Sequence, residues 1–146
     1  MWKFRTLFLF LVTFFIVSSV AAAPIRYYAN LTGGQELPAV TTSAYGRAGF
    51  EFDESASSMS YIIRTNIAAP TAAHIHCAPA GQNGPVGVTL QLRAATGHGT
   101  ITKPDTNNAC GWTSVADVMS AIQNGNAYIN VHTSAFPTGE IRGQIR

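Results

Sequence analysis

Short runs of alternating apolar and polar residues, separated by turn residues, recur along the chain from residue 25 onward. They cover residues 25–31, 47–53, 59–66, 71–77, 85–92, 99–102, 127–132 and 139–146. Alternation with a period of two is typical of strands that place one face on a core. Links rich in Gly and Pro at this spacing favour a sandwich or a barrel. The pattern therefore predicts an all-β fold.

One segment departs from this period. Residues 113–125 carry apolar residues at the helical spacing i, i+3, i+4 and i+7, namely Val115, Val118, Met119 and Ile122. Ser114 is suited to cap the start, with Asp117 three residues on, as in a capping box. Gly125 is a natural helix stop. The sequence predicts one short helix that packs its apolar stripe on the sandwich.

The first 23 residues have the layout of a signal peptide. Lys3 and Arg5 form a positive region, residues 7–17 are apolar except for Thr13, and residues 18–23 are mostly small. Cleavage is favoured near Ala22, because Pro24 follows Ala23 poorly. A membrane anchor is the alternative, but the run is shorter than the roughly 20 residues that span a bilayer. We therefore expect a secreted single domain over residues 24–146, in an extracellular or periplasmic compartment.

Charge then excludes several partners. The chain has 9 Lys and Arg and 7 Asp and Glu, and loss of Lys3 and Arg5 brings the two groups to equality. Without a basic patch, neither nucleic acid nor an anionic membrane surface is an expected partner. The few acidic residues are scattered, so no paired-carboxylate site stands out. The expected partner is an extracellular protein or a small ligand that the sequence does not identify.

Cys77 and Cys110 are the two cysteines, 33 positions apart. In an oxidising compartment such a pair is typical of one disulfide. The alternative is that the two thiols serve as metal ligands. The export signal favours the disulfide.

The alternation also assigns faces to the polar residues of three strands. If Ile75 faces the core, His74 and His76 share the opposite face, about 7 Å apart along the strand. In residues 127–132, Ile129 and Val131 face the core. In residues 139–146, Ile141 and Ile145 do so. The residues expected on the outer face of these last two strands are Tyr128, Asn130, His132, Glu140, Arg142 and Gln144.

A His-x-His pair and a third imidazole from another strand form a minimal ligand set for Cu or Zn. His74, His76 and His132 are therefore candidate ligands, and His98, in an expected loop between glycines, is a weaker fourth. The alternative is that these histidines only hydrogen-bond to nearby carbonyl or carboxylate groups. Asn30 begins a glycosylation sequon, which has meaning only in a host that glycosylates exported chains.

Three blocks of the chain resemble the CHRD domain, first described as repeats in chordin. They are LTGGQELPAVTTSAYGRAGFEFD, AAHIHCAPAGQNGPVGVTL and GNAYINVHTSAFPTGEIRGQIR. The resemblance implies an extracellular, immunoglobulin-like β-sandwich and no particular activity. The chain lacks the cysteine-rich modules of chordin, so growth-factor binding is not expected from it.

A more distant resemblance is to copper-zinc superoxide dismutase, also a Greek-key β-sandwich. It is carried by His74-x-His76, by His132 at the end of a later strand and by the late Arg142. It implies a copper site at the three histidines, with Arg142 as a guide for anions. The histidines and aspartate of a zinc site have no counterpart. We expect first a non-catalytic binding or structural module, and as the alternative a copper carrier or a superoxide-reactive oxidoreductase.

Overall fold

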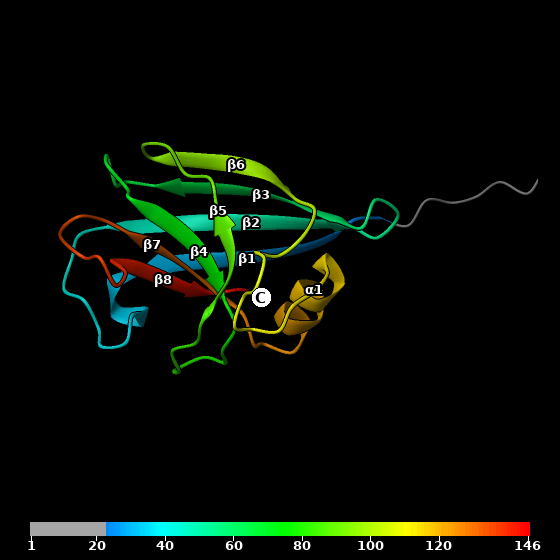
Figure 1. The fold of residues 1–146 in the computed structure, drawn as a ribbon. Helices are drawn as coiled ribbons and strands as arrows, with labels where there is room; N and C mark the ends of the chain where they lie inside the picture. Colours follow the sequence, from blue (N-terminus) through cyan, green and yellow to red (C-terminus); the bar gives the residue numbers. More distant parts are fainter. Residues whose placement is uncertain (1–22) are drawn as a thin grey trace, which may run out of the picture.

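The computed structural model describes residues 23–146, so the predicted signal peptide lies outside the described residues except for Ala23. The elements in chain order are β1 (Ile25–Thr32), η1 (Gly33–Gln35), β2 (Tyr45–Asp53), β3 (Ser58–Thr65), β4 (Ala72–His76), β5 (Val86–Leu90), β6 (Thr96–Ile101), α1 (Val115–Gln123), β7 (Tyr128–His132) and β8 (Ile141–Gln144). They are drawn in Figure 1. The predicted all-β class with one short helix is confirmed.

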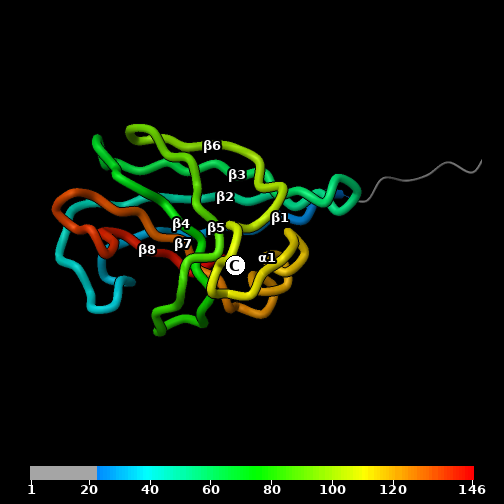
Figure 2. The backbone as a smooth tube through the Cα atoms, in the orientation of Figure 1, coloured from blue at the N-terminus to red at the C-terminus, as the bar shows by residue number. Residues whose placement is uncertain are grey.

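The strands form one antiparallel sheet in the order β5-β4-β7-β8-β1-β2-β3-β6. It bends at the thin junction of β8 with β1, where one pair joins Thr32 to Arg142 and two backbone bonds join Tyr28 to Arg146. The halves on either side of the bend therefore face each other, as Figures 1 and 2 show. The hydroxyl of Tyr61 on β3 accepts from the backbone N–H of Gln91, just after β5, at 2.7 Å. The sheet is thus nearly closed.

The core lies between the two halves and follows the predicted alternation. Its fully buried side chains come from both halves and from α1, and the largest are Leu31, Met59, Ile63, Ile75, Val118, Ile129, Val131, Ile141 and Ile145. Burial of such aliphatic side chains stabilises the fold by about 1.5–3 kcal/mol each.

Helix α1 covers one end of the sandwich. The Ser114 hydroxyl accepts from the backbone N–H of Asp117, and the Asp117 carboxylate accepts from that of Ser114. This is the capping box that the sequence predicts. The predicted apolar stripe is buried in the core. Among residues 23–146, no helix has the length and apolar character needed to cross a membrane.

The expectation that His98 lies in a loop is wrong. It lies within β6, where it pairs with Ile62 of β3. The flanking glycines permit close packing rather than a turn. A Cβ at Gly97 would lie 3.0 Å from the side chain of Leu92, and one at Gly99 would lie 2.9 Å from the Tyr61 hydroxyl.

Candidate metal centre

Strands β4 and β7 bring the three predicted histidines together. They pair antiparallel, with His74 opposite Asn130, His76 opposite Tyr128 and Ala72 opposite His132. Because Ile75, Ile129 and Val131 fill the core, the histidines leave the outer face of the sheet, as the alternation indicates.

That outer face is covered by loops rather than open to solvent. His76 and His132 are 8% exposed, and Arg142 is 2% exposed. Residues 77–85 contribute part of the cover, and the links 33–44 and 133–140, which lie at one end of the molecule in Figure 1, contribute the rest. A bond from the Thr42 hydroxyl to Glu140 joins these two links at 2.7 Å. His76 and His132 therefore lie in a polar layer beneath the loops, and His74, which is partly exposed, lies at its margin.

The imidazoles are close enough to share one ion. One ring nitrogen of each of His74, His76 and His132 lies within 4.8 Å of the other two. His74 Nδ1 is 3.0 Å from His132 Nε2. His98, exposed on β6, is not part of this group.

Backbone carbonyl groups fix the tautomers of two of the rings. The Nδ1–H of His76 donates to Gly84 O at 2.9 Å, and the Nδ1–H of His132 donates to Pro137 O at 3.0 Å. A carbonyl oxygen only accepts, so the proton resides on Nδ1 and each Nε2 keeps its lone pair. Histidines that bind metals commonly hold their second ring N–H in this way.

The surroundings also favour the neutral form of the imidazoles of His74 and His76, which is the form that binds metal. Burial, assisted by the neighbouring imidazoles of His132 and His76, lowers the pKa of His74 to about 4. Burial likewise lowers the pKa of His76, although the carbonyl oxygen of Gly84 and the amide oxygen of Asn130 beside the ring oppose the change.

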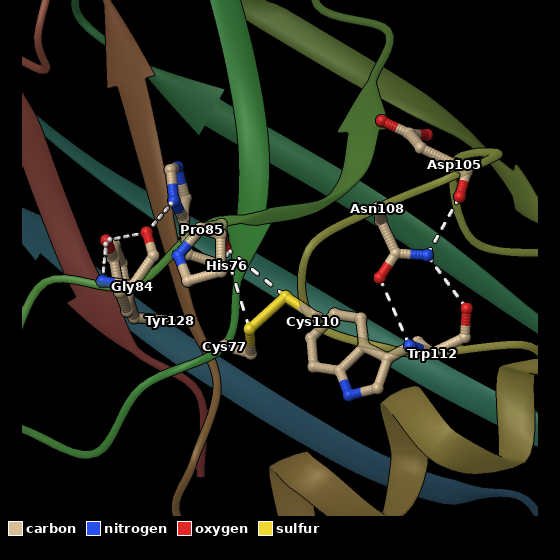
Figure 3. Close-up of a disulfide and its surroundings, with 9 residues drawn as sticks. All are labelled: His76, Cys77, Gly84, Pro85, Asp105, Asn108, Cys110, Trp112 and Tyr128. Atoms are coloured by element: carbon tan, nitrogen blue, oxygen red, sulfur yellow. Dashed lines mark hydrogen bonds between the residues drawn. A yellow bond between two sulfur atoms is a disulfide. The ribbon is translucent and has the colours of Figure 1, made fainter.

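Tyr128 and Arg142 form a stack that supports His76. The rings of His76 and Tyr128 are parallel within 6°, with centroids 4.7 Å apart. On the other side, Arg142 Cζ lies 3.4 Å from the centre of the Tyr128 ring, a cation–π contact. The Tyr128 hydroxyl accepts from the backbone N–H of Gly84. Figure 3 shows Tyr128, Gly84 and His76 grouped to one side of the disulfide.

Arg142 holds the loop that covers the site. Its guanidinium donates to Gln82 O at 2.7 Å and to Asn83 Oδ1 at 3.0 Å. Because this side chain is buried and bonded to the protein, the geometry favours a positioning role over the anion guidance that the second resemblance implies.

Glu36 belongs to the same buried layer and was missed from sequence. It is 6% exposed, and its Oε1 has no hydrogen-bond partner among the described residues. Burial raises the pKa of Glu36 to about 7, and the charge of Arg142 opposes that rise. The residue follows η1 in a Gly- and Pro-containing link, where no periodicity signals burial.

This carboxyl group predicts a pH dependence of stability. Its pKa is higher in the folded chain than the ordinary 4.5, so the folded state holds the proton more tightly. The contribution of Glu36 to the stability of the fold is therefore greatest below pH 4.5. It is lost as the pH rises through about 7. We expect Glu36→Gln to stabilise the protein by about 2 kcal/mol at pH 8 relative to wild type, and by little at pH 5.

Urea unfolding of both proteins at the two pH values, with a chelator present, measures this difference. Glu54→Gln, in an exposed turn, is the matched control and should leave the pH dependence as it is in wild type. An equal change at pH 5 and pH 8 in Glu36→Gln contradicts the assignment.

The predicted disulfide between Cys77 and Cys110 is present, with the two Cα atoms 5.8 Å apart. Cys77 directly follows His76 in the sequence, and Trp112 lies beside the disulfide (Figure 3). The cysteines are therefore not free to act as metal ligands. Asn30 lies exposed on β1, opposite Arg47, and its glycosylation stays a prediction.

Together, the fold and the site define a nearly closed β-sandwich domain with a cluster of three histidines, two of them buried beneath loops. Comparison of the sequence with known families then gives a match to the CHRD domain over residues 27–145. The chain belongs to the CHRD domain family, whose members occur in extracellular proteins. Neither curated proteins nor solved structures give a significant match.

Proposed function

We propose that this chain is a secreted CHRD-domain module that binds one copper ion through His74, His76 and His132. The observation that carries the proposal is the convergence of three imidazole nitrogens within 4.8 Å. Imidazole ligands suit copper, zinc, iron and nickel, and copper(II) is the most strongly bound of the divalent series. Hydrogen bonds from two rings to Gly84 O and Pro137 O support the proposal, because they aim both Nε2 atoms into the cluster.

Binding is favoured over turnover of superoxide. Arg142, the residue that suggested an anion path, is buried with its guanidinium bonded to Gln82 and Asn83. A redox enzyme also needs an open coordination position for its substrate. Secretion is supported by the amino-terminal sequence, by the disulfide and by the family.

Copper titration of the purified protein tests the proposal. We expect one equivalent of Cu(II) in wild type, with an electron paramagnetic resonance (EPR) spectrum typical of nitrogen ligands. His76→Ala removes one imidazole, so we expect the copper affinity to fall about 100-fold or more. His98→Ala is the matched control, because His98 is exposed on β6, and it should bind copper as wild type does.

Weak, non-stoichiometric copper with the same spectrum in wild type and His76→Ala would falsify the metal site. If the protein prefers zinc when both metals compete for it, the three histidines still form a metal site. The assignment of copper is then wrong. If copper is held, a superoxide-consumption assay separates a carrier from an enzyme, and we expect no activity above that of free copper.

A further inference from the structure

Asn130 lies between two of the proposed ligands. Its Oδ1 is 2.9 Å from His132 Nε2 and 3.0 Å from His76 Nε2, and the residue is 3% exposed. It comes from the middle of β7, opposite His74 on one side and Arg142 on the other. The buried side chain is therefore placed at the centre of the cluster.

The contacts of Asn130 bring acceptors together without a hydrogen atom between them. Each Nε2 presents a lone pair, because the proton of each ring is on Nδ1, where Gly84 O or Pro137 O accepts it. The amide oxygen presents lone pairs as well. Facing acceptors repel one another in a buried site, and a shared cation turns this repulsion into coordination.

The orientation of the amide agrees with this arrangement. Asn130 Nδ2 lies beside Gly139, since a Cβ at that glycine would lie 2.9 Å from it. A Cβ at Gly139 would also contact Glu36 Oε1. The amide nitrogen is thus on the side of the carboxyl group, and the oxygen is on the side of the imidazoles.

We propose that Asn130 supplies a fourth ligand, through Oδ1, to the ion held by the three histidines. This inference rests on the proposed function. Two ligand atoms at right angles, each about 2.0 Å from a metal, lie about 2.8 Å apart. The separations along the series His76 Nε2, Asn130 Oδ1, His132 Nε2 and His74 Nδ1 are 3.0, 2.9 and 3.0 Å.

Such a series of adjacent donors matches the perimeter of a tetragonal site with three nitrogens and one oxygen. Copper(II) prefers that geometry and that ligand type. In such a site Asn130 would occupy the fourth in-plane position, which is the position where Cu(II) binds its ligands most strongly.

Two substitutions at Asn130 and one exogenous ligand test the proposal. Asn130→Leu preserves the size of the side chain and removes the oxygen. We expect its Cu(II) affinity to fall about tenfold, its EPR spectrum to differ from that of wild type, and azide to bind the ion and shift the spectrum further. In wild type Asn130 holds that in-plane position, so azide should change the spectrum much less than in Asn130→Leu. Asn130→Asp keeps an oxygen in place and adds charge, so it should bind Cu(II) at least as tightly as wild type and also resist azide.

The outcomes separate the two proposals. Stoichiometric copper in Asn130→Leu with the wild-type spectrum and no response to azide overturns the ligand role, even if that variant is less stable. Weaker copper binding in Asn130→Asp than in wild type overturns it too, and this test remains if the leucine variant does not fold. Absence of stoichiometric copper in wild type overturns the three-histidine site and the ligand role together.

Discussion

Replacing Cys77 and Cys110 together by alanine is expected to lower the free energy of unfolding by about 4 kcal/mol. The disulfide joins positions separated by 33 residues. In the chain-entropy description, a closed loop of that length restricts the unfolded chain and so disfavours it. The loop contains β5 and β6, the two edge strands of the sheet. Loss of the disulfide therefore also weakens the closure of the sandwich.

Urea unfolding followed by Trp fluorescence measures this loss, because Trp112 lies beside the disulfide (Figure 3). Reduction of wild type with dithiothreitol is the matched control and should give the same loss, while the double alanine variant should not respond to the reductant. A free energy of unfolding within about 0.5 kcal/mol of wild type contradicts a stabilising disulfide.

Replacing Arg142 by methionine is expected to lower the free energy of unfolding by about 3 kcal/mol. Methionine retains the length and apolar stem but leaves Gln82 O and Asn83 Oδ1 without their donor. It also removes the cation from the face of Tyr128. Buried acceptors that lose a charged donor are costly.

The control is Arg26→Met. Arg26 pairs with Glu51 at 2.8 Å, but the two side chains are 59% and 42% exposed. A surface ion pair of this kind contributes about 1 kcal/mol or less. Urea unfolding should therefore give a clearly lower free energy of unfolding for Arg142→Met than for Arg26→Met. Proteolysis within residues 77–85 should also be faster in Arg142→Met. Equal losses in the two variants contradict a structural role for the buried guanidinium.

The strands and the direction of the histidines were predictable, because both depend on local periodicity. Ile75 between two histidines, and Ile129 and Val131 between polar neighbours, fix which face meets the core. The disulfide was predictable from cysteine count and compartment. The capping box of α1 was predictable because Ser114 and Asp117 act on backbone groups within one turn.

The cover over the site was not predictable from the same patterns. It depends on irregular links that fold back on the sheet, such as residues 77–85, where Gly84 supplies the carbonyl group for His76. Glu36 lies within one of these links, and Arg142 is buried against another through its bonds to Gln82 and Asn83. His98 was misplaced because glycines in a strand can serve close packing as well as turns.

The edges of the sheet also determine how this chain behaves beside its own copies. The free edge of a strand invites pairing with another chain. Here Asp105 occupies the outer edge of β5, since its carboxylate accepts from the backbone N–H and hydroxyl of Thr89, and its N–H donates to Gly87 O. Asp105 thus satisfies backbone groups of β5 that a second strand would use, which protects this edge of the sheet against pairing with another copy.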